Sequence, residues 1–495
     1  MVMKNPPLAA YYIAAAASLL GWSEVGLHLA FLLPALGAVL GSYFLAREFC
    51  SRALSAAMVV AVSPVFLICS TSVMCDMLML SFWVWAVYLW VRGLKQGRQL
   101  DLAVAAVLTT CCALTKYFGV SLLPLLAVYA WAKQRRLGPS ACYLLIPLGV
   151  LVLYQWGTLQ MYGRGLLSDA AAYASNIKPN SDIGAFSKVI IGLAFAGGCL
   201  VSGLFFTPWL SSLWRAAWHA GVTLLLVIPF LFVGHIGDLQ FHDALGFRWG
   251  VALQLAAFVF GGVSLCTVAV SELLNRRDAD TLLLVLWAGG TLVFASWLNW
   301  TVNGRSILPM APAVGILLMR RMDKVTPSRM LAARVTTILP LFLSAVIGLL
   351  AAWGDFRIAE AGRRTAEEVR RLFAESKGSV WFQGHWGFQY YMESYGAKPI
   401  DFWRSVLLKG DAVVIPSFGS NLDKPPPTLT ETRVLEWPSC RLLTLWNQEA
   451  GAGFYTAQMV PLPYAFVAAQ SEQYKVYEVN QSFGYRGQRP EGAAR

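Results

Sequence analysis

The feature that most constrains this chain is a repeated alternation of long apolar stretches with short clusters of Lys and Arg. A helix needs about 20 consecutive apolar residues to cross the hydrocarbon core of a bilayer. Twelve stretches approach that length, and they lie at residues 27–47, 52–70, 75–93, 101–115, 118–132, 141–157, 188–208, 219–234, 249–270, 281–297, 306–319 and 331–352. We therefore expect a polytopic α-helical membrane protein with about 12 spans.

Composition and charge exclude several other classes. Of the 495 residues, 57% are hydrophobic and only 13% are charged, whereas soluble proteins carry roughly 25% charged residues. A soluble enzyme, a disordered chain and a fibrous repeat are therefore excluded. The net charge of +12 would suit nucleic acid, but its Lys and Arg lie in short clusters between apolar stretches, as the positive-inside rule expects. We expect membrane lipids as partners, and no nucleic acid.

The loops between the stretches fall into two alternating sets. One set is longer and rich in Trp, Tyr, Asn and His. The other set is basic and holds Arg47, Arg52, Arg92, Lys95, Arg98, Lys133, Arg135, Arg136, Arg215, Arg276, Arg277, Arg320, Arg321, Lys324 and Arg329. Basic loops mark the cytoplasmic side, so the polar C-terminal region should lie outside. An even number of spans places the N-terminus outside as well, and Met1–Trp22 has no signal-peptide pattern. We therefore expect one further span and outer loop upstream.

The chain divides by polarity into two expected domains, a membrane domain at 1–352 and a small α/β domain at 353–495 outside the membrane. Residues 355–375 are strongly charged with a helical pattern. Short runs typical of β-strands follow, at residues 379–383, 411–416 and 441–446. A domain of roughly 140 residues is close to the usual size.

Neither the cysteines nor the histidines define a metal site. The nine cysteines include no CxxC pair, so we expect neither a zinc site nor a disulfide framework. The loop at 235–248 holds His235, Asp238, His242 and Asp243. Such side chains can bind a metal, but their spacing fits no known ligand pattern, so the sequence favours an ordinary polar loop at the interface. We assign no metal ligand or cofactor, and a divalent cation stays possible.

Four ionisable residues at the expected outer edge are candidates for function. Charged groups in or beside spans are costly and mark functional sites by default. Asp76 begins a span, where it is either a simple helix-terminal charge or a functional acid. Lys116 lies in a tight turn between two spans, where it either extends its ammonium to the interface or binds an anionic head group. Arg305 can likewise extend outward or clamp a phosphate, and Lys4 is either a solvated terminal charge or a phosphate ligand.

The outer loop at 158–188 offers a weaker signal. It mixes charges with aromatic side chains, including Tyr162, Arg164 and Asp169. This mixture suits a cover over a sugar or phosphate, and it suits an ordinary solvated loop as well.

Four sequence motifs resemble the GT-C glycosyltransferases of the family 39 type, which include dolichyl-phosphate-mannose mannosyltransferases, aminoarabinose transferases and Rgt-like proteins. Lys4-Asn5-Pro6-Pro7-Leu8-Ala9-Ala10-Tyr11-Tyr12 is similar to the K/H-x-P-P-L-x-x-Y element of this group. Cys75-Asp76-Met77-Leu78 resembles its acidic residue at the start of a span. Ala113-Leu114-Thr115-Lys116-Tyr117 resembles its A-L-T-K turn. Gly304-Arg305-Ser306-Ile307-Leu308-Pro309 resembles R-Y-L-L-P, with Ser306 in place of the usual aromatic residue.

The resemblance, which covers about residues 4–320, implies a GT-C-like fold and an enzyme. The enzyme would transfer a hexosyl or pentosyl group from a polyprenyl-phosphate donor to a lipid, glycan or protein acceptor outside a bacterial inner membrane, with the C-terminal domain periplasmic. Asp76 would be a catalytic residue that contributes an acidic group near the acceptor or donor sugar, and Lys4, Lys116, Tyr117 and Arg305 would bind substrate or carrier phosphate. The principal catalytic acid of the group precedes the P-P-L element, so this chain starts after it.

Two other functions stay open. A transporter or flippase of lipid-linked or polar solutes would show inverted repeats and polar groups in mid-span, whereas here the candidate residues collect at one membrane face. A catalytically inactive relative that binds carrier lipid is the second alternative, because the first acidic loop of the family is absent from the sequence.

Overall fold

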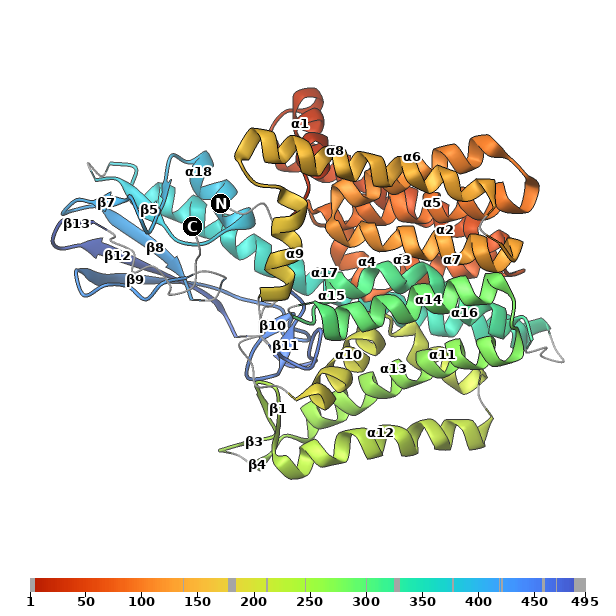
Figure 1. The fold of residues 1–495 in the computed structure, drawn as a ribbon. Coiled ribbons are helices and arrows are strands. Elements are labelled where there is room, and N and C mark those ends of the chain that lie inside the picture. Colours follow the sequence, from red (N-terminus) through yellow and green to blue (C-terminus); the bar gives the residue numbers. More distant parts are fainter. Residues whose placement is uncertain are drawn as a thin grey trace. The chain divides into compact units, whose positions relative to one another are not determined.

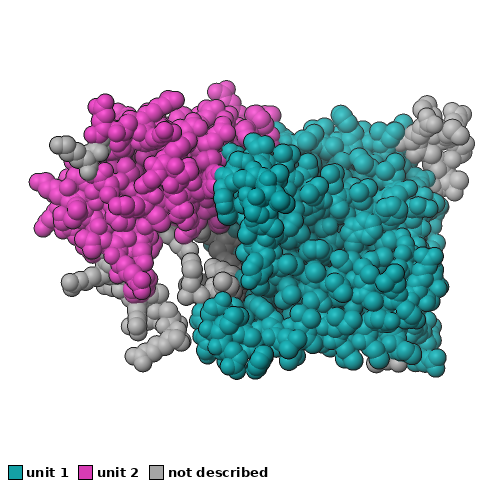
Figure 2. All heavy atoms as spheres, turned by 90° about the horizontal axis from the view of Figure 1, so that it is seen from above, with its two compact units in different colours: residues 1–352, 445–465 teal, residues 353–444, 466–495 magenta. Residues whose placement is uncertain are grey.

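The structure, a computed structural model, consists of two compact units. It describes all residues except 1–4, 137, 177–183, 211, 245, 300, 325–329, 376–377, 418, 420–421, 456–458, 469 and 485–495. The first unit comprises residues 1–352 and 445–465, and the second comprises residues 353–444 and 466–495 (Figure 2). We call them the membrane unit and the C-terminal unit.

The membrane unit is almost entirely helical, and its long helices lie side by side (Figure 1). Its α-helices are α1 (Leu8–Leu20), α2 (Glu24–Arg47), α3 (Ala53–Ala61), α4 (Pro64–Ser70), α5 (Cys75–Gln96), α6 (Gln99–Thr115), α7 (Leu122–Gln134), α8 (Leu145–Tyr162), α9 (Leu166–Asn176), α10 (Ala185–Cys199), α11 (Ser202–Leu210), α12 (Leu213–Val233), α13 (Trp249–Asn275), α14 (Ala279–Val293), α15 (Gly304–Ile307), α16 (Ala311–Met322) and the first part of α17 (Met330–Leu372). Its 3₁₀ helices are η1 (Tyr117–Ser121), η2 (Pro139–Leu144) and η4 (Leu308–Met310), and η3 (Phe294–Leu298) is a π-helix.

Within the described residues, seven helical segments are long and apolar enough to cross a membrane. Two bent pairs, α3 with α4 and α10 with α11, raise that number to nine if each pair is one span. These helices make the chain an integral membrane protein. The expected fold class is confirmed in its main features, since helices of membrane length precede a region that contains strands.

The expected number of about 12 spans is too high by this measure of length and composition. The expected spans at 101–115, 118–132 and 306–319 correspond to α6 with 17 residues, to α7 with 13 and to α16 with 12. Hydropathy recognised these segments as apolar, but it could not set their length. Lys116 does separate two of them, because α6 ends at Thr115 and η1 begins at Tyr117.

Small residues set the close packing of α10 on α13. A Cβ at Gly197 would lie 1.9 Å from the carbonyl oxygen of Phe258, and one at Gly262 would lie 2.2 Å from that of Leu193. The two backbones therefore approach more closely than any larger side chain allows. Small residues are the usual means of packing helices in membranes, where the hydrophobic effect between helices is lost.

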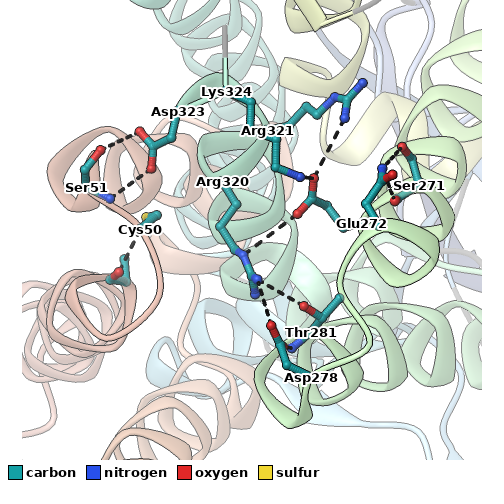
Figure 3. Close-up of polar contacts among 12 residues, drawn as sticks. Cys50, Ser51, Ser271, Glu272, Asp278, Thr281, Arg320, Arg321, Asp323 and Lys324 are labelled. Atoms are coloured by element: carbon teal, nitrogen blue, oxygen red, sulfur yellow. Dashed lines mark hydrogen bonds and ion pairs between the residues drawn. The ribbon is translucent and has the colours of Figure 1, made fainter.

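The basic loops at one end of the membrane unit are tied together by ion pairs (Figure 3). Glu272, which is fully buried, accepts a hydrogen bond from Lys324 and lies within 4.0 Å of Arg320 and Arg321. We call these four residues the Glu272 cluster. Through Arg320, which also donates a 3.0 Å hydrogen bond to Thr281, the cluster joins α13, α14 and α16.

The C-terminal unit is built on a mixed five-stranded sheet with strand order β6-β5-β8-β12-β9. These strands are β6 (Lys398–Pro399), β5 (Val380–Phe382), β8 (Ala412–Pro416), β12 (Glu472–Val479) and β9 (Leu429–Trp437). β5 runs parallel to β6 and β8, while β12 runs antiparallel to β8 and β9. A short pair, β7 (Val406–Leu407) with β13 (Phe483–Gly484), and helix α18 (Trp386–Ser394) complete the unit.

The core of this unit lies where the end of α17 meets the sheet. Ala361 and Val369 of α17 pack with Phe382, Val414 and Val476 of the strands. The expected helix at 355–375 and the strands near 379–383 and 411–416 are therefore present. The run at 441–446 is not a regular strand, and the two longest strands, β9 and β12, were not anticipated from the sequence.

Residues 445–465 belong to the membrane unit, although they follow and precede segments of the C-terminal unit. We call this segment the strap. It contains the short hairpin of β10 (Trp446–Asn447) and β11 (Ala452–Gly453), which lies beside α10 and α15 (Figure 1). Two further hairpins, β1 (His235–Ile236) with β2 (Leu239–Gln240) and β3 (His242–Asp243) with β4 (Gly246–Phe247), connect α12 to α13. The sequence had assigned residues 445–465 to the outer domain.

Candidate functional site

Asp76 lies in the first turn of α5, and its side chain is almost fully buried, with 1% exposed. A carboxylate at this place interacts favourably with the helix dipole. Its two oxygens, however, accept hydrogen bonds from two cationic side chains, Lys116 and Arg305. Asp76 is therefore more than a helix-terminal charge.

Lys116 reaches Asp76 from the sharp turn between α6 and η1. Its backbone is extended, which ends α6, and the chain then folds back over the helix it has just left. Gly119 makes this return possible, since a Cβ there would lie 2.5 Å from the Cys112 carbonyl oxygen. The ammonium of Lys116 donates a 2.7 Å hydrogen bond to Oδ1 of Asp76, so it does not simply extend to the interface.

Arg305 reaches the same carboxylate from the short helix α15. Asn303 caps this helix, with its side-chain oxygen accepting a hydrogen bond from the backbone of Ser306. The preceding π-helix η3 ends α14, and π-helical turns are frequent at functional sites. The guanidinium of Arg305 contacts Oδ2 of Asp76 twice, from Nε at 2.9 Å and from Nη2 at 2.7 Å.

Asp76, Lys116 and Arg305 form one compact group, which we call the Asp76 cluster. With one carboxylate and two cations, it carries a formal charge of +1. The carboxylate is buried, but the side chains of Lys116 and Arg305 remain 21% and 26% exposed. The cluster thus presents partly accessible positive charge that is held in a fixed position, an arrangement suited to an anion such as a phosphate.

The two remaining predicted site residues are not part of this group. The hydroxyl of Tyr117 lies 3.3 Å from the hydroxyl of Tyr154 and 3.3 Å from the carbonyl oxygen of Leu166, so it points toward α8 and α9. Lys4 lies outside the described residues. The helix that follows Lys4 in the sequence is α1. Its Ala9 packs against Cys75 and Leu78 of α5. Roles for Tyr117 and Lys4 in phosphate binding stay predictions.

The described parts of the loops at 235–248 and 158–188 contain no assembled metal site. His242 and Asp243 pair with Phe247 and Gly246 in the β3–β4 hairpin. Among the described residues, no group of three or more His, Cys, Asp or Glu side chains is arranged to hold a metal ion. The loop at 158–188 contains α9, and Arg164 pairs with Asp169 at 3.4 Å. None of the nine cysteines, which all lie among the described residues, forms a disulfide.

Sequence reasoning missed the residues that hold the cluster in place. Asn303 and Gly304 directly precede Arg305, and an Asn followed by a short helical run is a recognisable N-cap. No local pattern in the sequence, in contrast, predicted that Phe454 and Tyr455 of the strap lie near the cluster. The Phe454 carbonyl accepts a hydrogen bond from the Gly304 amide at 3.0 Å, although the two residues are far apart in the sequence.

Comparison with known proteins gives one family match. Residues 4–156 match the family model described as dolichyl-phosphate-mannose-protein mannosyltransferase. No curated protein matches the chain. Among solved structures, ArnT from Cupriavidus metallidurans in its apo state is similar over 84% of this chain and 83% of its own, with 15% sequence identity and a TM-score of 0.40. A similarity this low carries no argument about this chain.

The family match covers the parts of the site that lie early in the chain. Asp76, Lys116 and Tyr117 fall within the matched residues, whereas Arg305 and the strap follow them. The resemblance noted from the motifs is confirmed for this segment. The chain is thus similar to dolichyl-phosphate-mannose-protein mannosyltransferases over residues 4–156, and it has helices of membrane length.

Proposed function

We propose that this chain transfers a sugar from a polyprenyl-phosphate donor to an acceptor at the membrane surface, and that Lys116 and Arg305 bind the phosphate of the carrier. The observation that supports this proposal is the Asp76 cluster, in which two partly exposed cations converge on one buried carboxylate. The acceptor would be a lipid, a glycan or a protein outside a bacterial inner membrane, with the C-terminal unit on the same side.

The proposed reaction is a displacement at the anomeric carbon of the donor. An acceptor oxygen forms a bond to this carbon while the bond from carbon to phosphate oxygen breaks, and the bonding electrons remain on the phosphate. The departing polyprenyl phosphate therefore gains negative charge in the transition state. Fixed cations that face such developing charge are among the largest contributions an enzyme makes to catalysis.

Asp76 suits a supporting role better than the role of catalytic acid expected from the sequence. Because it is buried and both of its oxygens already accept hydrogen bonds from cations, it has neither access to an acceptor nor a free oxygen to take up a proton. We propose that it holds Lys116 and Arg305 at a fixed separation, so that the two side chains need not reorganise when phosphate binds. The group that accepts the proton of the acceptor is not assigned.

The test measures both binding and transfer. Purified protein in detergent is incubated with polyprenyl phosphate to measure affinity, and with polyprenyl-phosphate donors that carry labelled sugars to measure transfer. Replacing Lys116→Gln or Arg305→Gln removes one charged hydrogen-bond donor and should weaken carrier binding about 10- to 100-fold. Lys324→Gln is the matched control, because it removes a cation from another buried carboxylate at the other end of the membrane unit.

The outcomes separate the proposed enzyme from its alternatives. Loss of binding in both site variants, with binding retained in Lys324→Gln, supports the phosphate site. Binding without transfer from any donor would support an inactive carrier-lipid-binding relative. If polyprenyl phosphate does not bind the unsubstituted chain, or if both site variants bind it as well as that chain does, the proposal is wrong.

A further inference from the structure

The strap contacts α15, the short helix that carries Arg305. The contact is at Gly304, the first residue of α15. The amide of Gly304 donates a 3.0 Å hydrogen bond to the carbonyl oxygen of Phe454, and Gly304 directly precedes Arg305. The Phe454 side chain is fully buried at this place. The start of α15 is thus fixed from outside by a residue 150 positions later in the chain.

The fit between Gly304 and Phe454 leaves no room for a side chain. A Cβ on Gly304 would lie 2.2 Å from Cε2 of Phe454 and 2.6 Å from its Cδ2, far closer than carbon atoms pack. The phenyl ring therefore occupies the space beside α15 that a side chain at position 304 would need. Because buried side chains are packed as densely as an organic crystal, a change on either side of this contact must move the other.

Tyr455, the next residue of the strap, contacts the segment that leads to Asp76. The hydroxyl of Tyr455 lies 3.4 Å from the hydroxyl of Ser72, in the turn that leads into Asp76. The rings of Phe454 and Tyr455 pack edge to face, with centroids 4.8 Å apart. Two adjacent residues thus bridge the segments that carry Arg305 and Asp76.

The strap is itself firmly held in the membrane unit. Tyr464, which is fully buried, donates a 2.9 Å hydrogen bond to the Gly198 carbonyl of α10. Arg248 donates to the carbonyl of Glu449, and the Asp238 amide donates to the Met459 carbonyl at 3.3 Å. These contacts fix the described residues of the strap to the helices and hairpins of the membrane unit.

We infer that Phe454 and Tyr455 are positioning residues of the Asp76 cluster, with Phe454 setting the place of Arg305 and Tyr455 setting the turn before Asp76. This inference rests on the proposed function for its binding readout. According to this inference, the strap contributes to the phosphate site. The strap lies outside the residues that match the family model. The direct consequence of the inference is that carrier binding depends on the strap.

The test is a double-mutant cycle between the two sides of the contact. Gly304→Ala should weaken polyprenyl-phosphate binding about 10- to 100-fold, because small misplacements of a binding group have effects of this size. Phe454→Ala should weaken it as well. In the Phe454→Ala background, adding Gly304→Ala should cause little further loss, because the ring that clashed is gone.

Two controls and a second readout isolate the positioning role. Gly289→Ala adds a methyl group where nothing lies within 4 Å, and Phe206→Ala removes another fully buried ring of the membrane unit. Phe206→Ala should lower the melting temperature but leave carrier affinity unchanged. Hydrogen exchange measured by mass spectrometry should rise over the peptide at 301–308 in Phe454→Ala and stay unchanged in Phe206→Ala.

Failure of this inference is distinct from failure of the proposed function. If the unsubstituted chain binds polyprenyl phosphate but Phe454→Ala binds it equally well, the strap does not position the site. Additive losses in the cycle would contradict the direct contact between Gly304 and Phe454. If the unsubstituted chain does not bind the carrier, the proposed function fails, while hydrogen exchange still reports whether the strap fixes α15.

Discussion

The membrane unit holds two buried carboxylates that are paired with several cations, and they differ in how those cations are used. Asp76 makes three short contacts of 2.7 to 2.9 Å to Lys116 and Arg305. Glu272 accepts one hydrogen bond, from Lys324, while Arg320 and Arg321 lie 4.0 Å away. The first arrangement is tight, and the second is loose.

The two clusters are carried by different helices and lie at opposite ends of the membrane unit. α5 begins beside Asp76 and ends near Lys95, which pairs with Asp280 at the start of α14. α14 then leads through η3 toward Arg305, and α16 leads away from Arg305 to Arg320. A helix of 22 residues, such as α5, is about 33 Å long. The Glu272 cluster therefore lies near the end of α5 that is opposite Asp76.

Accessibility separates the two clusters further. Arg320 is 4% exposed, and its Nε and Nη1 atoms have no hydrogen-bond partner among the described residues. Lys116 and Arg305 keep about a quarter of their side chains exposed, at 21% and 26%. A buried ion pair that no ligand can reach serves packing and registration, whereas a partly exposed and geometrically fixed one can also bind an anion. This difference gives rise to the predictions below.

The largest effect is expected from removing each carboxylate. Asp76→Asn and Glu272→Gln each remove a buried carboxylate from the cations around it, and each should lower the free energy of unfolding by about 3 kcal/mol. Only Asp76→Asn should also reduce sugar transfer, by more than about 100-fold, since its cations are the proposed phosphate ligands. Thermal unfolding in detergent and donor saturation curves measure the two effects. Equal loss of carrier affinity in both variants would remove the functional distinction between the clusters.

Glu472 provides a contrast to Asp76 and Glu272, because its carboxyl has no cation beside it among the described residues. Burial raises the pKa of the Glu472 carboxyl of β12 from an ordinary value of 4.5 to about 7, and the described residues offer it no ion-pair partner. Between these values the folded state binds more protons than the unfolded state, so stability is greatest below about pH 4.5 and falls as pH rises through 7. The expected decrease is about 2 kcal/mol, discounted for partial exposure.

The measurement for Glu472 is thermal unfolding of the C-terminal unit within the full chain, between pH 4.5 and 8. Glu472→Gln should remove this decrease and should be more stable than the unsubstituted chain at pH 8, because glutamine needs no proton to stay neutral. If the two proteins show parallel pH profiles, Glu472 is ionised in the folded state and does not differ from Asp76 in this way.

A conservative exchange tests the tight geometry of the Asp76 cluster. Arg305→Lys keeps the charge but replaces two contacts with Oδ2 of Asp76, a hydrogen bond from Nε and an ion pair from Nη2, with a single one, and should weaken carrier binding about tenfold. Arg321→Lys changes a contact of 4.0 Å and should leave both stability and carrier affinity within about twofold of their starting values. Similar losses in both variants would mean that charge alone, rather than the guanidinium fork, decides binding.

The smallest effect is expected at Tyr117. Its hydroxyl makes two contacts of 3.3 Å, to Tyr154 and the Leu166 carbonyl, so Tyr117→Phe should lower stability by about 1 kcal/mol or less. Carrier affinity should stay unchanged if the hydroxyl serves only α8 and α9. A tenfold loss of affinity would instead support the phosphate-binding role that the sequence motif predicts, and would extend the site beyond the Asp76 cluster.

Local patterns in the sequence were enough to find the candidates one at a time. Asp76, Lys116 and Arg305 each interrupt an apolar stretch at its edge, and an ionisable group in such a place is costly whatever the fold. The helical pattern of residues 355–375 and the strands near 380 and 412 were equally local. Glu272 was missed, although it too ends an apolar stretch, because its basic neighbours were attributed to membrane orientation alone.

The sequence by itself determined that this chain crosses a membrane, because hydropathy and the spacing of basic loops are properties of neighbouring residues. It could not determine the lengths of α6, α7 and α16, which depend on where each helix is capped. Only the tertiary structure decided that Lys116 and Arg305, separated from Asp76 by 40 and 229 positions, share one carboxylate. It also decided that Phe454 lies against Gly304. Such contacts depend on how several helices pack, and no local pattern records them.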